Sequence, residues 1–430
     1  MEVKFKFHFF FIYICDIIFW GEKMKLEDIN NIEKGLKDEF EKIDELVEFN
    51  CQKVLNAFWK EKVDTTFFNG TTGYGYGDKG RDEIEKIFAQ VLNKEDALVR
   101  IQFISGTHAV STALFAMLRS GDTMMAISGT PYDTIHEIIG LRDNPSSLKS
   151  MGVNYEQVEL IDNKEFDEEK IITKLKEKKI KLIEIQRSRG YSTRNAITVD
   201  RINSIIEKIR KVDSEVIIMV DNCYGELTDY EEPNSDIIVG SLIKNLGAGL
   251  APMGAYIAGK KELIELCADR LGAPGLGKEG GASLGFNRSL LQGLFMAPRV
   301  VGDAMKNCIL ASKIFEELGY EVVPRYNEKR SDIVQTIMLN DEQKLIKFVQ
   351  GIQMGSPVDS FALPEPWDMP GYESKIIMAS GAFIEGSSIE ISCDAPLRPP
   401  YAAFLQGGLV YEYNKIALIK SLENMGAITK

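Results

Sequence analysis

The sequence predicts an α/β fold, with a large domain built on a mostly parallel β-sheet and a smaller C-terminal α+β domain. From about residue 97, short apolar runs alternate with stretches of helical periodicity, which is the pattern of βαβ units. Near residue 300 this alternation gives way to a helix–strand–helix pattern. With 430 residues, of which 44% are hydrophobic, the chain is long enough to bury both cores.

The first 23 residues are expected to stand outside this fold. They join lysines to an apolar run, as a signal peptide does, but Asp16 interrupts the run and no small-residue cleavage site follows. The run is also shorter than the roughly 20 residues that a membrane span needs. We therefore predict a start-site miscall or a disordered segment, with Met24 as the initiator. A membrane tether is the alternative.

Residues 24–95 are predicted to form a helical arm and a glycine-rich loop. Apolar residues recur at helical spacing over 25–62, which predicts one long helix or a pair of helices. The glycines of 70–80 interrupt this pattern, because glycine disfavours regular helix. Helical periodicity resumes over 82–92.

The large domain is predicted over 96–300 and the small domain over 301–430. In the small domain we expect a helix at Ala304–Leu318, a strand at Glu321–Val323 and a helix at Asp341–Met354. In the large domain, helices are expected at Val110–Leu118 and Arg201–Lys211. The expected strands of the large domain are Ala97–Ile104, Thr123–Ile127, Lys181–Gln186, Glu215–Val220, Ile237–Gly240 and Ala255–Ile257.

Composition disfavours several classes of function. The 51 basic and 64 acidic residues give a net charge of −13, which argues against nucleic acid or an anionic membrane as partner. Six cysteines lie far apart without a C-x-x-C pair, and there are three histidines, so no metal site is expected. Unpaired, reduced cysteines favour a cytoplasmic protein.

Two charged residues follow apolar runs that are predicted to be neighbouring strands. Asp221 closes the first run, and Lys244 follows the second. The carboxyl ends of strands in an α/β sheet open into the ligand crevice, so both side chains are expected in one site. A lysine that forms a Schiff base and a carboxylate that keeps a pyridine nitrogen protonated suit pyridoxal 5′-phosphate (PLP).

We therefore predict Lys244 as the catalytic residue and Asp221 as a cofactor ligand. Burial beside a cationic ring is expected to lower the pKa of Lys244. The alternatives are a solvated lysine and an acid that caps the next helix.

The segment Ser105–Ala109 follows a predicted strand and opens a predicted helix. The N-terminus of a helix presents free N–H groups and a favourable dipole to an anion. We predict the PLP phosphate at Gly106 and Thr107, with Ser241 contributing from across the site. His108 is placed near the ring, with a purely structural histidine as the alternative.

Three further side chains follow predicted strands. Tyr132 is predicted to stack on the pyridine ring, although a turn tyrosine is the alternative. Arg187 and the adjacent Ser188 are expected to contact the substrate or the phenolic oxygen of the cofactor. Arg398, fixed among prolines, is suited to bind a substrate carboxylate, with a surface ion pair as the alternative.

The glycine-rich loop offers candidates for a contact between subunits. Tyr74, Tyr76 and Arg81 are expected to reach a phosphate across a dimer interface, and an ordinary flexible loop is the alternative.

Taken together, these segments resemble fold-type I PLP enzymes of the cystathionine/methionine γ-lyase superfamily. They are most similar to its bacterial methionine γ-lyase-like or "aluminium resistance" branch, from about residue 30 to 425. The resemblance implies Lys244 as the internal aldimine, Asp221 as the pyridinium partner, and Gly106, Thr107 and Ser241 as phosphate ligands. The strings that carry it are GTTGYGYGDKGR at 70–81, SGTHA at 105–109, SGTPYDT at 128–134, IQRSRGYS at 185–192, VDNCYGE at 220–226, GSLIKNLGAGLAP at 240–252 and DAPLRPPY at 394–401.

The resemblance also implies an activity and an assembly. The expected activity is that of a carbon–sulfur lyase acting on a sulfur-containing amino acid, of the cystathionine β-lyase or methionine γ-lyase type. The expected assembly is a homodimer or homotetramer, in which Tyr76 comes from a neighbouring subunit. Two features depart from better-studied relatives: Ile243 replaces a serine or threonine before the lysine, and Tyr74-Gly-Tyr76-Gly replaces a tyrosine-x-arginine clamp.

Several alternatives stay open. An aminotransferase, racemase or aldolase would use the same cofactor residues, because one scaffold supports many reactions. A non-catalytic PLP-binding protein would share them too. A nicotinamide-dependent enzyme is disfavoured, because no G-x-G-x-x-G motif follows an early strand.

Overall fold

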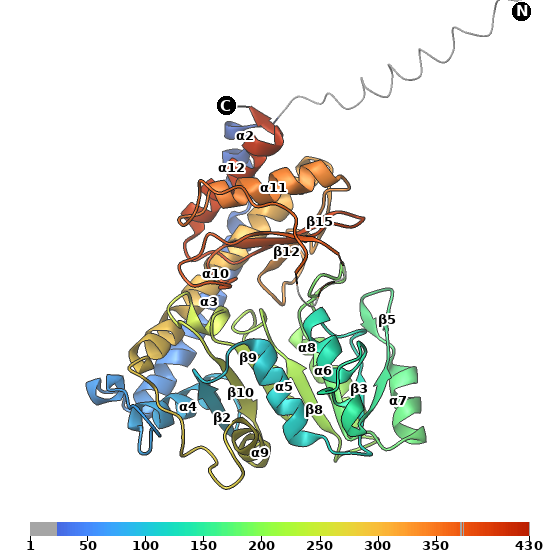
Figure 1. Cartoon of the computed structure of the whole chain (residues 1–430). Coiled ribbons are helices and arrows are strands. Elements are labelled where there is room, and N and C mark those ends of the chain that lie inside the picture. The colour runs from blue at the N-terminus through green and yellow to red at the C-terminus, as the bar shows by residue number, and fades with distance from the viewer. Residues whose placement is uncertain (1–23, 370–371, 373, 430) are drawn as a thin grey trace, which may run out of the picture.

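The structure is a computed structural model that describes residues 24–369, 372 and 374–429. The prediction made for residues 1–23 lies outside these ranges. The large domain fills the lower part of Figure 1 and the small domain the upper part, and long helices run between the two.

The large domain is built on a mixed, mostly parallel sheet, which confirms the predicted fold class. Within the described residues the sheet has seven strands in the order β2-β10-β9-β8-β7-β3-β4, and β10 alone runs antiparallel to its neighbours. The strands are β2 (Asp96–Arg100), β3 (Thr123–Ala126), β4 (Asn154–Gln157), β7 (Leu182–Gln186), β8 (Ile217–Asp221), β9 (Ile237–Ser241) and β10 (Ala255–Gly259).

Both faces of this sheet are buried, which explains why its strands read as continuous apolar runs. Along β8, Ile217 and Met219 pack on one side and Ile218 and Val220 on the other. The first side is covered by α5 (Gly106–Met117) and α9 (Lys261–Leu271), with α6 (His136–Ile139) nearby. The second side packs against α4 (Lys79–Val91), α7 (Glu168–Glu177) and α8 (Val199–Arg210).

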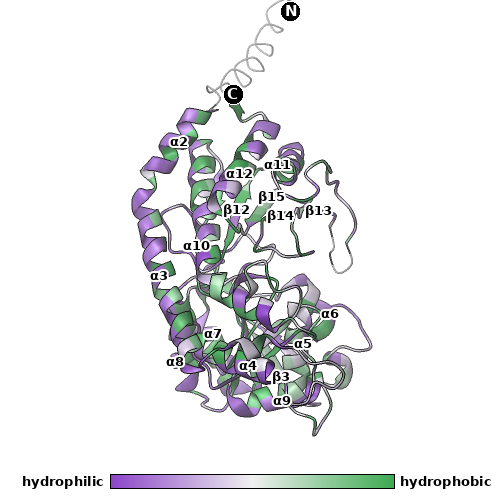
Figure 2. Cartoon of the chain, turned by 90° about the vertical axis from the view of Figure 1, so that its left-hand side faces the viewer, coloured by the Kyte–Doolittle hydropathy of each residue, from purple (hydrophilic) through white to green (hydrophobic). Residues whose placement is uncertain are grey.

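The small domain is an antiparallel sheet with helices on one face. Over the described ranges its strand order is β11-β12-β15-β14-β13. Its strands are coloured largely as hydrophobic in Figure 2, since helices bury them. The elements are β11 (Glu321–Val323), β12 (Val334–Met338), α11 (Glu342–Met354), β13 (Ile376–Ala379), β14 (Ser392–Pro396), β15 (Ala402–Gln406) and α12 (Tyr411–Met425).

Helix α10 (Asn287–Glu317) links the two domains. It is 31 residues long, and the helix predicted at Ala304–Leu318 is its C-terminal half. Because α10 continues without a break through residue 300, the domain boundary placed there stays a prediction. The N-terminal arm, α2 (Leu26–Gly35) and α3 (Lys37–Lys60), is the predicted helix pair. Its contact with α10 is close: a Cβ added at Gly302 would lie 2.3 Å from Val47 Cγ2.

Two short two-stranded sheets complete the described part of the chain. The first pairs β1 (Met24–Lys25) in parallel with β16 (Ile428–Thr429), which brings the ends of the described chain together at the top of Figure 1. The second pairs β5 (Leu160–Ile161) with β6 (Glu165–Phe166). Among the described helices, none combines the length and apolar character needed to cross a bilayer.

Candidate active site

A cavity of about 200 Å³ opens where the carboxyl ends of the parallel strands face the small domain. Residues from both domains form its wall, so the cavity depends on how the domains pack. The large domain contributes Ser105, Gly106, Thr107, Val110, Tyr132, Thr134, Ile135, Gln186, Ser188, Gly190, Tyr191, Asp221, Cys223, Tyr224, Ser241, Ile243 and Lys244, and the small domain contributes Val334, Asp394, Phe404 and Gln406.

Lys244 is held in this cavity from both its backbone and its side chain. Its carbonyl oxygen accepts hydrogen bonds from the N–H groups of Gly247 and Ala248, at 3.3 and 3.2 Å, in the turn η4 (Asn245–Gly247). Its Nζ lies 3.9 Å from the centre of the Tyr224 ring, a distance at which a cation is attracted to an aromatic face. These contacts restrict the positions that the Lys244 amine can take in the cavity.

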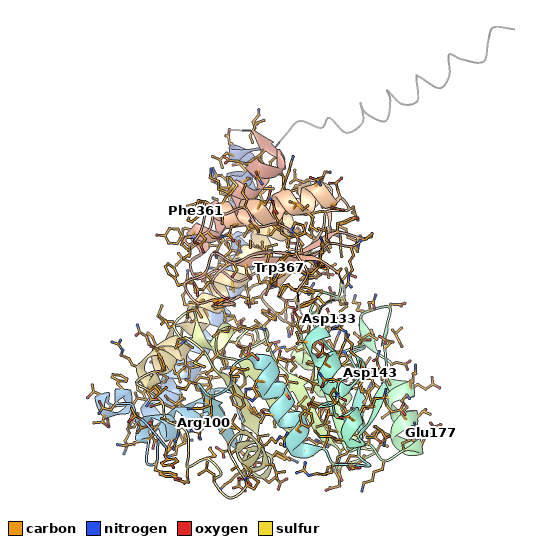
Figure 3. The ribbon with its side chains drawn as sticks, viewed as in Figure 1. Arg100, Asp133, Asp143, Glu177, Phe361 and Trp367 are labelled. Atoms are coloured by element: carbon orange, nitrogen blue, oxygen red, sulfur yellow. The ribbon has the colours of Figure 1, made fainter. Side chains whose placement is uncertain are left out.

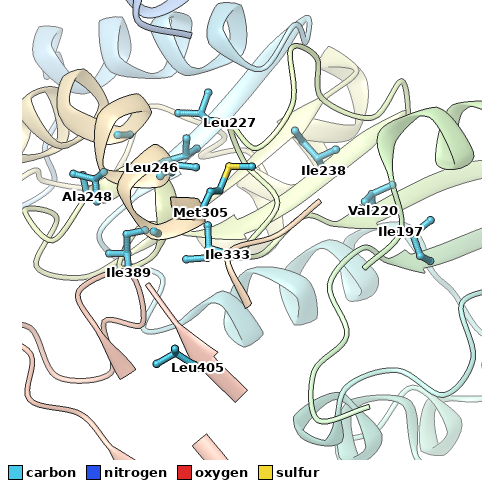
Figure 4. Packing of buried hydrophobic residues seen from close by; sticks show 14 of the residues in the cluster. Ile197, Val220, Leu227, Ile238, Leu246, Ala248, Met305, Ile333, Ile389 and Leu405 are labelled. Atoms are coloured by element: carbon cyan, nitrogen blue, oxygen red, sulfur yellow. The ribbon is translucent and has the colours of Figure 1, made fainter. Parts of the chain in front are cut away.

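The turn after Lys244 rests on a core shared by the two domains. Figure 4 shows Leu246 and Ala248 beside Met305 of α10, with Ile333 and Ile389 of the small domain close by. These side chains are all at most 5% exposed. Close packing of this kind leaves the turn little freedom to move.

In the protein alone, the protonated form of the Lys244 amine is favoured. Burial lowers the pKa of Lys244, but the negative charge that Cys223, Tyr224 and Asp221 can carry raises it, and the net direction is upward from 10.5. The lowered pKa expected for this lysine is thus not found in the protein alone. The amine needs either a change in its surroundings or a proton acceptor before it can act as a nucleophile.

Asp221 is the last residue of β8, and it lies at the cavity wall. Its Oδ1 accepts a hydrogen bond from the N–H of Cys223 at 3.1 Å. This bond fixes the carboxylate relative to the following turn.

The first turn of α5 forms another part of the wall. Ser105 caps the helix by accepting a hydrogen bond from the N–H of His108 at 3.1 Å. Gly106 approaches β9 so closely that an added Cβ would lie 3.2 Å from the Cβ of Ser241. Thr107 Oγ1 lies 3.2 Å from Thr134 Oγ1. Hydroxyl groups and first-turn N–H groups thus converge where an anion can bind.

Tyr132 lines the cavity and belongs to an aromatic cluster that connects the domains. Its hydroxyl is hydrogen-bonded to that of Tyr372, and its ring centre lies 5.8 Å from that of Tyr191. Figure 3 labels Asp133, the next residue along the chain, on the side of the large domain that faces the small-domain segment containing Trp367. The cluster closes one side of the cavity.

The structure places His108 away from the cavity wall. Its Nδ1 accepts a hydrogen bond from the N–H of Ile104 at 3.3 Å, and its ring packs edge-on against Phe103. Burial lowers the pKa of His108, which favours the neutral ring that this acceptor role requires. These contacts give His108 a structural role, and its place near the cofactor ring stays a prediction.

Arg187 also lies outside the cavity, and its predicted contact with substrate is corrected. Its guanidinium is fully buried and donates to Asn222 Oδ1 at 2.8 Å and to Glu232 Oε2 at 3.1 Å. A Cβ at Gly225 would lie 2.5 Å from Arg187 Cδ, so the arginine packs under the turn that carries Cys223 and Tyr224. The adjacent Ser188 does line the cavity.

Arg398 and Tyr76 are both exposed and do not line the cavity of their own chain. Tyr76 is stacked on Tyr74, with ring centres 5.6 Å apart. Arg81 instead holds this loop in shape, because it donates to the carbonyl oxygens of Gly75 and Gly281 at 2.9 Å each. The role of Arg398 in binding a substrate carboxylate stays a prediction.

Sequence reasoning missed several residues of the wall. Tyr224, beneath the Lys244 amine, adopts a left-handed backbone with φ of 69°, which is unusual outside glycine. Asp394 and Gln406 come from the small-domain sheet. The signal for Asp394 was at hand, since it begins the same string in which Arg398 was chosen.

Similar solved structures define the class of this fold. The PLP-dependent protein YhfS of Escherichia coli is 15% identical, with a TM-score of 0.56 over 89% of this chain and 97% of the other. Cystathionine gamma synthase of Xanthomonas oryzae pv. oryzae is 14% identical, with a TM-score of 0.57 over 83% and 89% of the two chains. The fold is that of fold-type I PLP enzymes.

Closer relatives narrow the class to one family. The family described as methionine gamma-lyase matches residues 25–426, and this chain belongs to it. The carbon-sulfur lyase involved in aluminum resistance from Clostridium novyi NT is 47% identical, with a TM-score of 0.89 over 92% of this chain and 94% of the other. The uncharacterized protein YnbB of Bacillus subtilis (strain 168) is 41% identical over 415 residues, which are 95% of this chain and 98% of YnbB.

The residues of the cavity fit the cofactor that the fold implies. Its wall offers donors for a phosphate at the first turn of α5, a carboxylate at Asp221 and an amine at Lys244. These are the three kinds of group that PLP needs. The narrow gap between Gly106 and Ser241 leaves the backbone bare there, as close approach of a phosphate requires.

Proposed function

We propose that this protein is a PLP-dependent carbon–sulfur lyase acting on a sulfur-containing amino acid, of the cystathionine β-lyase or methionine γ-lyase type. The observation that carries the proposal is the meeting of Lys244, Asp221 and the first turn of α5 in one cavity. Membership of the methionine gamma-lyase family supports the reaction type. PLP, when bound, supplies an electron sink that stabilises a carbanion at the substrate α-carbon.

Each residue then has a defined task. Lys244 would anchor the cofactor, and its Nζ would serve as the general base that takes the α-proton of the substrate. Asp221 keeps the ring nitrogen protonated, and Gly106, Thr107 and Ser241 hold the phosphate. Tyr132 stacks on the ring.

The protein around Lys244 supports these tasks. The ring of Tyr224 lies beneath the amine and limits the positions that it can take. The small domain forms the other side of the cavity through Val334, Asp394, Phe404 and Gln406.

Assembly is part of the proposal. We infer a homodimer or homotetramer in which Tyr76 reaches the phosphate in a neighbouring subunit. The exposure of Tyr76 on the glycine-rich loop supports this, because the side chain has no role within its own chain beyond stacking on Tyr74.

The activity is tested with a panel of thioether amino acids in deuterated water. A lyase releases a thiol, a keto acid and ammonia and exchanges the α-proton, and Lys244→Ala is expected to abolish product release and exchange. Lys261→Ala, at the exposed start of α9, is the matched control and should retain activity. Keto acid without thiol would indicate another PLP reaction, whereas no exchange with any amino acid would contradict catalysis.

A further inference from the structure

One charged group of the cavity has no task in the proposed function. Asp394, on β14, lies on the small-domain wall and is partly exposed to the cavity. Its Oδ2 accepts a hydrogen bond from Gln406 Nε2 at 2.8 Å, which fixes the carboxylate from the neighbouring strand β15. It faces the large-domain wall that carries the predicted cofactor residues, so it lies on the side left to the substrate.

The charges of the wall are unbalanced around Asp394. Among the described lining residues, the carboxylates are Asp221 and Asp394, and Lys244 is the one cationic side chain. Asp221 and Lys244 are both committed to the cofactor. When Lys244 binds the cofactor, the described lining residues leave Asp394 without a positively charged partner.

Unpaired oxygen atoms line the cavity on both of its walls. Gln406 Oε1 from the small domain and Gln186 Oε1 from the large domain are buried without a hydrogen-bond partner. Both glutamines already use their amide N–H groups, Gln406 on Asp394 and Gln186 on the carbonyl oxygen of Ser188 at 2.9 Å. Oxygens left without donors are costly when buried, so these positions suit a ligand that donates hydrogen bonds.

Aromatic rings surround this region. The Tyr191 ring centre lies 5.4 Å from that of Phe404 and 5.8 Å from that of Tyr132. All three side chains line the cavity. Aromatic faces beside a carboxylate form the environment that an ammonium group prefers.

We propose that Asp394, together with Gln406 and Gln186, binds a positively charged group on the side chain of the substrate. The substrate is then an amino acid with a second, distal ammonium group, and an uncharged thioether such as methionine is a poor one. This rests on the proposed function and narrows it to one class of sulfur amino acid. Burial raises the pKa of Asp394 to about 6, and the Gln406 amide, Tyr191 and Lys244 oppose this, so its carboxylate is still largely ionised at neutral pH.

The test uses two pairs of ligands, in each of which one side chain ends in an ammonium group and the other ends in an uncharged methyl group. The first pair is L-lysine and L-norleucine, and their affinities for the PLP-loaded protein are measured by calorimetry. The second pair is S-(2-aminoethyl)-L-cysteine and S-propyl-L-cysteine, and their kcat/KM values are compared. In each pair the ammonium compound is expected to be favoured by about tenfold or more, as for a hydrogen bond to a charged group.

Asp394→Asn should remove this preference while the borohydride-reduced cofactor adduct still forms. Asp394→Glu should keep the preference, because it retains the charge. Asp359→Asn makes the same chemical change at an exposed position of the small domain and should change nothing. Unchanged unfolding midpoints show that the variants are folded.

Two results would overturn the inference. The first is that the wild-type protein binds norleucine as tightly as lysine, or that it binds neither compound while it cleaves methionine. This result is obtained with wild-type protein and does not depend on the folding of a variant. The other is a preference that survives in Asp394→Asn. Failure of the proposed function itself is distinguishable, because then no thioether releases a thiol whether or not lysine binds better than norleucine.

Discussion

A lysine that follows a β-strand is ordinarily solvated, whereas Lys244 is only partly exposed and lines the cavity. The ring of Tyr224 lies under its amine, and the turn after it is locked by two hydrogen bonds to its carbonyl oxygen. Further ionisable groups are buried behind the site, and Glu226 is one of them. It is fully buried, and its Oε1 accepts a hydrogen bond from the Tyr256 hydroxyl at 2.8 Å.

Glu226 is expected to make stability depend on pH. Burial raises the pKa of Glu226 from 4.5 to about 8. Between these values the folded protein keeps a proton that the unfolded chain releases, so the free energy of unfolding falls as pH rises through this window. Glu226→Gln removes the titration and should be stabilised relative to wild type at pH 8.5 by a few kcal/mol, at about 1.4 kcal/mol for each unit of pKa shift.

Urea unfolding at pH 5 and pH 8.5 measures this difference. The pKa of Glu184 is raised to about 8 by burial and by the charge of Asp221, so part of the pH dependence should persist in the variant. An unchanged dependence in Glu226→Gln would show that Glu226 is ionised in the folded protein.

At the residue scale, the sequence predicts those site residues that strand ends position directly. Asp221 and Lys244 could be predicted from the sequence because each follows an apolar run. Ser105–Thr107 could be predicted because a helix starts there. Asp394 begins the string in which Arg398 was chosen, but it follows no buried strand of the large sheet, and only packing between the domains brings it to the cavity. The contact predicted for Arg187 is not found. Arg187 follows a strand as expected, but its side chain lies beneath the site, where it contacts Asn222 and Glu232.

At the scale of elements, burial on both faces decides what the sequence reveals. β7, β8 and β9 lie within two residues of prediction, because each is a short run of buried apolar residues. The strand predicted to reach Ile104 ends at Arg100, and Ile104 is 79% exposed. α5 starts at Gly106 rather than Val110, since Gly-Thr-His resembles a turn. β12, β14 and β15 carry mixed sequences and were not predicted.

The contact between α10 and the turn η4 is expected to govern cofactor binding. A Cβ at Gly293 would lie 2.6 Å from the carbonyl oxygen of Gly247, which is too close for either backbone to stay in place. Gly293→Ala should therefore displace the turn that holds Lys244. Overpacking of this kind costs about 1–3 kcal/mol, and the affinity for PLP should fall about tenfold.

PLP titration followed by absorbance provides the measurement. Gly35→Ala is the matched control, because an added Cβ there has no atom within 4 Å, and its PLP affinity should be unchanged. Equal affinities in both variants would mean that η4 is free to adjust.

For the whole molecule, the cavity exists only because two domains are held against each other. α10 runs from one domain into the other, and the core beneath Lys244 includes side chains from both. Apolar side chains also remain exposed at the end of the large domain that carries the glycine-rich loop. Tyr74 is 78% exposed and Ile104 79%, and an interface with a second copy would cover them.

Sedimentation velocity tests the expected assembly. Wild-type protein should sediment as a dimer or tetramer at micromolar concentration, and Ile104→Asp should shift it toward the monomer, because the interface would then bury an unpaired charge. Lys60→Ala, at the exposed end of α3, is the control and should leave the assembly intact. A monomeric wild-type protein would contradict the assembly and the role of Tyr76 in a neighbouring subunit.

The central claim is that Lys244 carries PLP, and borohydride reduction of the PLP-loaded protein tests it most directly. The preparation should be yellow, should lose its colour on reduction, and should yield one modified peptide on mass spectrometry, with the adduct on Lys244. Lys244→Ala should give no such peptide. An adduct on a different lysine, or a protein that takes up no PLP, would contradict the account.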